Sequence, residues 1–297
     1  MRVAVVDIGT NTTRLLIADV RDGAVSELDR RSVVTRLGEG VDRSGRLSDA
    51  AQARVLAVLD DYVRAIEDHG CERRRAVLTS AVRDADNGAE LTRRVAGLGL
   101  DARILTGDEE ARLTFLGASA GRGDADLLVI DVGGGSTELV KGPHEHVSTQ
   151  NGVVRHSERH LHDDPPTREQ LAALAADVRQ NLKGTVPFNG PLGKAVAVAG
   201  TPTQCAAMDL GLEPYDAERV EGHVLTADRL RGLLAQTASV PLEERKRIAG
   251  LDPARAPVIV AGIVILLQVL QFFGLDRTEV SEHDILWGAA LDAENVR

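Results

Sequence analysis

The stretch 129–138, VIDVGGGSTE, places the strongest constraint on what this chain can fold into. Apolar residues run into Asp131, three glycines follow, and two hydroxyl residues precede Glu138. This order predicts a buried strand that ends in a tight turn. Glycines let the backbone approach a ligand closely, and successive N–H groups in such a turn bind phosphate oxygens. Asp131 and Glu138 are the hard oxygen ligands that a divalent cation on phosphate prefers. Taken alone, the stretch is also compatible with a glycine-rich turn beside two solvated acids.

The same pattern recurs elsewhere in the chain. Residues 5–13, VVDIGTNTT, again run from an apolar strand through Asp7 and Gly9 into hydroxyl and amide side chains. Residues 195–203, AVAVAGTPT, keep the strand and the Gly-Thr turn but lack the acid. Because internal repeats can decide a fold, two similar turns in separate halves predict two similar domains that face each other across a phosphate.

Composition narrows the class of protein. The 297 residues are enough for two domains, and the 43% hydrophobic content supports sizeable cores. A formal net charge of -10 argues against a general binder of nucleic acid or anionic membranes. Cys71 and Cys205 form no metal-binding spacing or disulfide framework, which favours a reducing cytosol. The apolar run 258–270 is too short for a membrane span and predicts a helix buried on all sides.

Strands and helices alternate along the chain, which indicates an α/β fold. Strands are expected near 25–28 and 33–37, and a long helix is expected to begin at Ser48 and to end at Gly70. Residues 121–126 are interpreted as a linker. Thr167 and Gln170 have the spacing of a capping box. After the strand at 196–199, we expect mainly helices.

Several charged residues are candidates for chemistry. Glu109 and Glu110 open a helix, where an acid is either a capping residue or a general base in a cleft. Arg83 follows a strand and is either a phosphate clamp or a surface ion pair. The clustered histidines flank loops and are interpreted as surface residues: His144, His146, His156, His160 and His162.

Five ordered motifs together resemble one family. They are 7–12 (DIGTNT), 79–87 (TSAVRDADN), 107–112 (GDEEAR), 131–138 (DVGGGSTE) and 199–203 (AGTPT). In this order and spacing they resemble the exopolyphosphatase / guanosine pentaphosphate phosphohydrolase (Ppx/GppA) family, in its short two-domain actinobacterial form. The resemblance covers nearly the whole chain. It implies two actin-like (ribonuclease H-like) α/β domains with mixed sheets flanked by helices and an interdomain cleft. The implied domains are 1–121 and 122–283, with 284–297 packing back on the first.

The resemblance also implies a role for individual residues. Glu110 aligns with the catalytic base, and Asp131 and Glu138, helped by Asp7, align with acids that hold Mg²⁺. The implied phosphate-binding residues are Thr10, Asn11, Thr12, Arg14, Arg83, Gly133, Gly134, Gly135, Ser136, Thr137, Gly200 and Thr201. Mn²⁺ is the alternative metal, and K⁺ is an expected activator.

The implied activity is removal of the terminal phosphate of inorganic polyphosphate by water. Hydrolysis of guanosine pentaphosphate in the same site is the nearest alternative, and an ATP-dependent small-molecule kinase or a non-enzymatic actin-like filament or scaffold protein are more distant ones. The resemblance further implies a cytoplasmic homodimer that binds neither nucleic acid nor membrane. One departure is at 284–288, where DILWG replaces the Arg and Glu of a common family motif with apolar residues.

Overall fold

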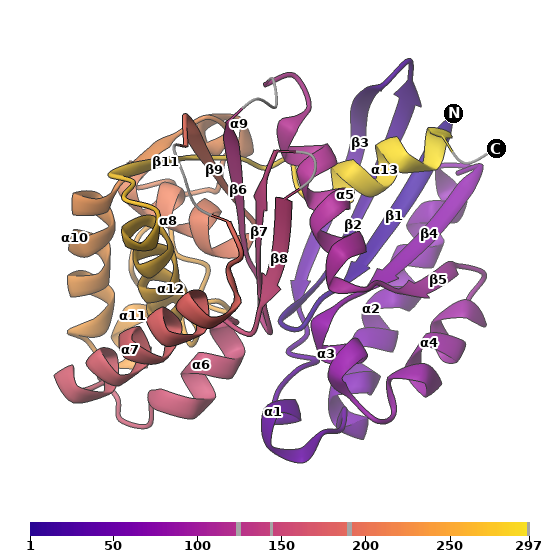
Figure 1. Cartoon of the computed structure of the whole chain (residues 1–297). Coiled ribbons are helices and arrows are strands. Elements are labelled where there is room, and N and C mark those ends of the chain that lie inside the picture. Colours follow the sequence, from indigo (N-terminus) through magenta and orange to yellow (C-terminus); the bar gives the residue numbers. More distant parts are fainter. Residues whose placement is uncertain (123–125, 143–144, 189–191, 296–297) are drawn as a thin grey trace. The chain divides into compact units, whose positions relative to one another are not determined.

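The computed structural model describes residues 1–122, 126–142, 145–188 and 192–295. The chain forms two compact units (Figure 1). Unit 1 comprises Met1–Ala120 together with His283–Arg297, and unit 2 comprises Gly121–Glu282. Each unit is built around its own mixed β-sheet flanked by helices, as expected for this α/β fold.

Unit 1 begins with an antiparallel strand pair and ends with the C-terminal helix of the chain. Its elements are β1 (Arg2–Ile8), β2 (Thr12–Arg21), β3 (Ala24–Val34), α1 (Val41–Ser44), α2 (Asp49–Asp68), β4 (Arg73–Leu78), α3 (Ser80–Asp84), α4 (Gly88–Ala96), β5 (Asp101–Ile104), α5 (Gly107–Ser119) and α13 (Ile285–Asn295). The long helix α2 begins as predicted, because Ser48 accepts a hydrogen bond from the Ala51 N–H. Gly70 follows it with a positive φ, which is the expected stop signal.

The sheet of unit 1 has the order β3-β2-β1-β4-β5, and its central strands β1 and β2 are buried on both faces. Side chains alternate along a strand. Val6 and Ile8 therefore pack in one apolar cluster with α2, whereas Val3 and Val5 pack in another with α5 and α13. Figure 1 shows α13, in yellow, beside the indigo strands of the N-terminus. The last helix of the chain thus completes the core that the first strands begin.

Unit 2 follows the same plan. Its elements are β6 (Leu127–Val132), β7 (Thr137–Lys141), β8 (Glu145–Thr149), α6 (Val153–His160), α7 (Arg168–Thr185), β9 (Lys194–Val198), α8 (Gly200–Leu210), α9 (Ala217–Val220), β10 (Val224–Thr226), α10 (Ala227–Ala238), α11 (Leu242–Arg245), α12 (Ile259–Phe272) and β11 (Arg277–Val280). Five strands in the order β8-β7-β6-β9-β11 repeat the arrangement of unit 1, and β10 adds an antiparallel edge. The repeat inferred from the two Asp-x-Gly turns is therefore a repeat of whole sheets.

The most apolar helix of the chain lies in the core of unit 2. Most residues of α12 are buried in a cluster with α6, α7, α8 and α10. This agrees with the prediction of a helix buried on all sides. Across the described part of the chain, no helix is both long enough and apolar enough to cross a membrane.

Some local expectations were wrong. The strands expected near 25–28 and 33–37 are one continuous strand, β3, which pairs along its length with β2. The region after β9 is not only helical, because β10 and β11 join the second sheet. Both are short, and their pairing partners are distant in sequence, so local periodicity could not reveal them. Part of the expected linker 121–126 lies outside the described residues.

The crossing of α5 and α13 yields a test of the packing in unit 1. A Cβ atom on Gly288 would overlap the Leu113 carbonyl, and one on Gly117 would overlap the Asp284 carbonyl. We therefore expect Gly288→Ala to destabilise unit 1 by about 1–3 kcal/mol, as overpacking does. The matched control is Gly232→Ala on α10, where nothing lies within 4 Å of the added atom. Because alanine is the better helix former, this control should gain about 1 kcal/mol. Urea unfolding followed by circular dichroism measures both changes, and a stable Gly288→Ala protein would contradict the helix crossing.

Candidate active site

The first predicted phosphate turn joins β1 to β2 in unit 1. The Gly9 N–H donates to the Thr12 carbonyl at 3.0 Å and closes the turn. The Thr10 and Asn11 carbonyls accept hydrogen bonds from N–H groups in the segment 35–38. In a planar trans peptide the N–H points opposite to the carbonyl. The N–H groups of Asn11 and Thr12 are therefore turned away from that segment, as a phosphate-binding turn requires.

Three charged side chains lie together just before and after this turn. Arg14 donates to the Asp7 carboxylate from Nε at 3.0 Å and from Nη2 at 2.7 Å, and it also pairs with Asp284. Asp7 and Arg14 are direct cross-strand partners on β1 and β2, while Asp284 precedes α13. Arg14 was predicted to contact phosphate. Here its guanidinium joins the first strand pair to the C-terminal helix.

Two carboxyl groups share the Arg14 guanidinium in this cluster, and their pKa values shift in opposite directions. Burial raises the pKa of Asp7, although Arg14 opposes this effect. Burial also opposes ionisation of Asp284, but Arg14, Arg30 and the Leu286 N–H hold the pKa of Asp284 below its ordinary value. Among the described residues, Asp7 Oδ1 is buried without a hydrogen-bond partner. A buried carboxylate oxygen of this kind suits a water molecule or a cation.

The two glutamates at the start of α5 have different environments. Glu109 is the capping residue, because its Oε2 accepts the Thr106 N–H at 2.8 Å in a capping box. Glu110 is 7% exposed and accepts a hydrogen bond from Arg83 Nη1 at 2.9 Å. Arg83 Nη1 also donates to the Leu105 carbonyl at 3.0 Å. The structure therefore brings Arg83 and Glu110 together inside unit 1. Glu109, one residue earlier, has a different partner, Thr106.

The glycine-rich turn of unit 2 is held by the start of α6. The carbonyls of Gly133 and Gly134 accept the N–H groups of Val153 and Val154 at 3.0 and 2.8 Å. The carbonyl of Gly135 accepts Arg155 Nε at 3.0 Å. Because three successive carbonyls point to α6, the N–H groups of residues 134–136 point away from it. This array of N–H groups can bind an anion.

Gly152 and Thr137 hold the backbone of this turn in place from within the protein. A Cβ atom on Gly152 would overlap the backbone of Gly135, so only glycine allows so close an approach. Thr137 is fully buried, and its hydroxyl donates to the Asn151 carbonyl. The Thr137 hydroxyl therefore supports the turn from inside.

The two acids of this turn form a candidate metal site. Asp131 on β6 and Glu138 on β7 are direct cross-strand partners, and both are buried. Ser148 Oγ donates to Glu138 Oε1 at 2.7 Å. Like charges opposite each other on neighbouring strands are destabilising, and a divalent cation removes the repulsion. In unit 1 the corresponding cross-strand position holds Arg14 opposite Asp7, so the donor set for a metal is better at Asp131 and Glu138.

The third turn, at Gly200 and Thr201, differs from the other two. It lies between β9 and the helix α8 and therefore corresponds to the β4–α3 connection of unit 1, not to a strand pair. A Cβ atom on Gly200 would overlap the guanidinium of Arg255. Arg255 could not be predicted from the sequence, because it lies in a loop more than fifty residues later with no motif around it.

The interpretation of the histidines as surface residues was wrong for His156. Its side chain is fully buried in the first half of α6, next to Asp177 of α7. Burial lowers the pKa of His156 to about 4. His160 also contacts Asp177, which supplies the carboxylate that the sequence pattern did not reveal. His144 lies outside the described residues.

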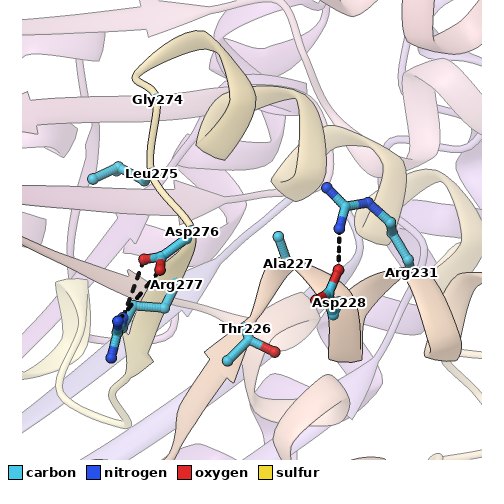
Figure 2. A pocket seen from close by; sticks show the side chains of 8 residues that line it. All are labelled: Thr226, Ala227, Asp228, Arg231, Gly274, Leu275, Asp276 and Arg277. Carbon is cyan, nitrogen blue, oxygen red and sulfur yellow. Dashed lines mark hydrogen bonds and ion pairs between the residues drawn. The ribbon is translucent and has the colours of Figure 1, made fainter.

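A separate hollow in unit 2 lies between the start of α10 and the segment 274–277 that follows α12. Figure 2 shows its lining: Thr226, Ala227, Asp228, Arg231, Gly274, Leu275, Asp276 and Arg277. Its two arginines are directed to neighbouring acids, Arg231 to Asp228 and Arg277 to Asp276. None of the predicted site residues lines this hollow.

Comparison with known proteins places this arrangement in context. Residues 16–291 match the model of the Ppx/GppA phosphatase family. The chain is 38% identical over 313 residues to exopolyphosphatase 2 of Mycobacterium tuberculosis, with 98% of both chains covered. It is also similar to the crystal structure of the Aquifex aeolicus family member, with a TM-score of 0.83 and 33% identity over 99% of this chain and 98% of the other. An exopolyphosphatase from Cytophaga hutchinsonii superimposes with a TM-score of 0.87 and 26% identity over 99% and 98% of the two chains.

The sheets, the glycine-rich turn and these similarities together define a phosphoanhydride hydrolase. The chain belongs to the Ppx/GppA phosphatase family. This assignment favours hydrolysis over the kinase and the filament alternatives.

Proposed function

We propose that this protein is an exopolyphosphatase, which removes the terminal phosphate of inorganic polyphosphate by attack of water. The observation that carries the proposal is the environment of Glu110, which is buried and held by Arg83 while Glu109 only caps the helix. The similarity to exopolyphosphatase 2 over the whole chain supports the choice of substrate.

Each predicted residue has a role in this proposal. Backbone N–H groups of Asn11 and Thr12 and of residues 134–136 bind phosphate oxygens, and the Gly200–Thr201 turn contributes to the same binding. Gly133 and Thr137 support the second turn, because the Gly133 N–H donates to the Ser136 carbonyl and the Thr137 hydroxyl donates to the Asn151 carbonyl. Arg83 positions Glu110 and also contacts phosphate, since a guanidinium carries five N–H donors. For Arg14 the structure supports a positioning role, because its guanidinium holds Asp7.

Asp131 and Glu138 are the residues that would hold Mg²⁺, with Asp7 Oδ1 as a further, water-mediated ligand. Their fit rests on the buried cross-strand pair of carboxylates within unit 2. Bound there, the cation would offset the charge that develops on the phosphate oxygens.

In the proposed reaction Glu110 orients a water molecule and accepts its proton. The water oxygen forms a bond to the terminal phosphorus, and the bond from that phosphorus to the bridging oxygen breaks. The bridging oxygen leaves with the shortened chain, and inorganic phosphate is the second product. The backbone turns bind the charged oxygens without changing shape, which favours the transition state.

A parallel substrate assay tests this function. We expect phosphate release from polyphosphate in the presence of Mg²⁺, with products shortened by one unit from the end, and loss of release when a chelator removes the metal. Guanosine pentaphosphate, assayed at the same concentration, tests the alternative activity. A higher kcat/KM for guanosine pentaphosphate would favour that alternative, and turnover of neither compound would contradict both.

Other expectations stay predictions. These are activation by K⁺, a homodimer, a cytoplasmic location, and the assignment of units 1 and 2 as the two functional domains. Size-exclusion chromatography with light scattering tests the dimer, and a K⁺ titration of the phosphate-release assay tests the activation.

A further inference from the structure

Two histidines and an aspartate of unit 2 lie together outside the proposed catalytic residues. His156 and His160 are one turn apart on α6, and Asp177 lies on α7. Figure 1 shows that α6 and α7 are neighbouring helices. Asp177 Oδ2 is 2.8 Å from His160 Nε2 and 3.6 Å from His156 Nδ1. One ligand atom from each of the three residues lies within 4.8 Å of the other two.

A chain of hydrogen bonds fixes the tautomer of His156. Thr149 Oγ1 donates its hydrogen to the Thr137 carbonyl at 3.0 Å, so it can only accept from Asn151. The amide nitrogen of Asn151 therefore points to Thr149, and its Oδ1 points to His156 Nε2 at 3.1 Å. Because Oδ1 can only accept, His156 Nε2 carries the hydrogen. His156 Nδ1 is left with a lone pair.

This lone pair points at a carboxylate. Within the described part of the chain, His156 Nδ1 is buried and has no hydrogen-bond partner. A ring nitrogen without a hydrogen and an ionised carboxylate oxygen repel each other. A cation between them removes this repulsion, because both atoms can coordinate it. A histidine that donates its other ring N–H to an oxygen acceptor is also the usual arrangement for a metal ligand. Arg159 Nη1 lies 4.0 Å from the same Asp177 oxygen, but such an exposed ion pair is weak and can yield.

We propose that His156 Nδ1, His160 Nε2 and the Asp177 carboxylate bind a divalent transition-metal ion of the zinc type. Zinc takes nitrogen ligands at about 2.0–2.1 Å and carboxylate oxygens at about 2.0–2.2 Å, so tetrahedral ligand atoms lie roughly 3.3–3.5 Å apart. The spacing of His156 and Asp177 already approaches this value. His160 and Asp177 must separate by roughly half an ångström, and both side chains are partly exposed and can move. Water would complete the coordination.

The position of this site links it to the glycine-rich turn. The first residues of α6 hold the Gly133 and Gly134 carbonyls, and the last residue of α6 is His160. A metal that joins α6 to α7 would therefore brace the helix that supports the turn. This inference concerns metal binding and does not depend on the proposed activity.

Spectroscopic titration of the tag-free full chain with Co²⁺ tests the site. Excess Mg²⁺ is present throughout, so that the acids at Asp131 and Glu138 are occupied. We expect one equivalent of Co²⁺ to produce the visible absorption of a four-coordinate nitrogen and oxygen site, and Zn²⁺ to displace it. Zn²⁺ should also raise the melting temperature of unit 2.

Three variants locate the site. Asp177→Asn and His160→Gln change partly exposed side chains. Loss of a residue that only supports a metal ligand typically costs about 10–100-fold in metal affinity, so loss of a ligand itself should lower the affinity for Co²⁺ by about 100-fold or more. His162→Gln, a change at an exposed residue just beyond α6, is the matched control and should bind as the natural chain does. Absence of stoichiometric Co²⁺ binding, or unchanged affinity in either ligand variant with a native circular dichroism spectrum, would overturn the proposal.

Discussion

Glu110→Gln is expected to lower kcat for phosphate release by about 10²–10⁴-fold while polyphosphate still binds. Glutamine keeps the size of the side chain and can still contact Arg83, but it cannot accept a proton from water. The loss corresponds to about 2.7–5.5 kcal/mol of activation free energy. Steady-state phosphate release measures kcat, and binding of polyphosphate to the inactive variant measures the affinity separately.

Glu109→Gln is the matched control, because it makes the same chemical change one residue earlier. Glu109 closes the capping box with Thr106, and glutamine also serves in that position. We therefore expect Glu109→Gln to retain the activity of the natural chain. If Glu110→Gln kept its kcat, or if both variants lost activity equally, Glu110 would not be the base.

Arg14→Met is expected to destabilise unit 1 by about 3–5 kcal/mol, since it removes the cation of a buried cluster and leaves two carboxylates. The Arg14 side chain is 16% exposed, and those of Asp7 and Asp284 are 7% and 3% exposed. Trp287, the only tryptophan, lies on α13 next to this cluster in sequence, so its fluorescence during urea unfolding reports on unit 1.

The same two strands provide the control. Arg2 and Asp19 are also cross-strand partners on β1 and β2, but their side chains are 38% and 46% exposed. Solvent screens such a pair, so Arg2→Met should change the stability far less than Arg14→Met does. Equal losses in the two variants would contradict a special contribution of the buried cluster.

The effect of Arg14→Met should depend on pH. In the natural chain the pKa of Asp284 is lowered, so its contribution is present at neutral pH and is lost as the pH falls through the folded-state pKa. Without Arg14 the pKa of Asp7 rises further above its unfolded value, and the pKa of Asp284 rises from its lowered value. The folded variant then binds protons more tightly than its unfolded state, and its stability falls as the pH rises. The deficit should be largest at neutral pH and should shrink as the pH approaches about 4.

Local features of this protein could be predicted from sequence because their causes are local. The Asp-x-Gly turns, the Ser48 cap, the Thr167–Gln170 capping box and the buried helix at 259–272 each depend on residues within a few positions. The repeat of the two sheets also followed from the recurrence of one short pattern. By contrast, β10 and β11 were missed, because a short edge strand is defined by its distant partner.

The candidate site shows the same division between local and distant causes. The sequence by itself determined the family, the glycine-rich turn and the pair of acids around it, since these lie within eight consecutive residues. Only the tertiary structure decided that Glu109 caps the helix while Glu110 is held by Arg83, and that Arg14 pairs with Asp284, 270 residues away. It likewise placed His156 in the interior beside Asp177. Hydrogen bonds and ion pairs act over a few ångströms in space, so the partners of a charged side chain depend on which distant segments the fold brings together.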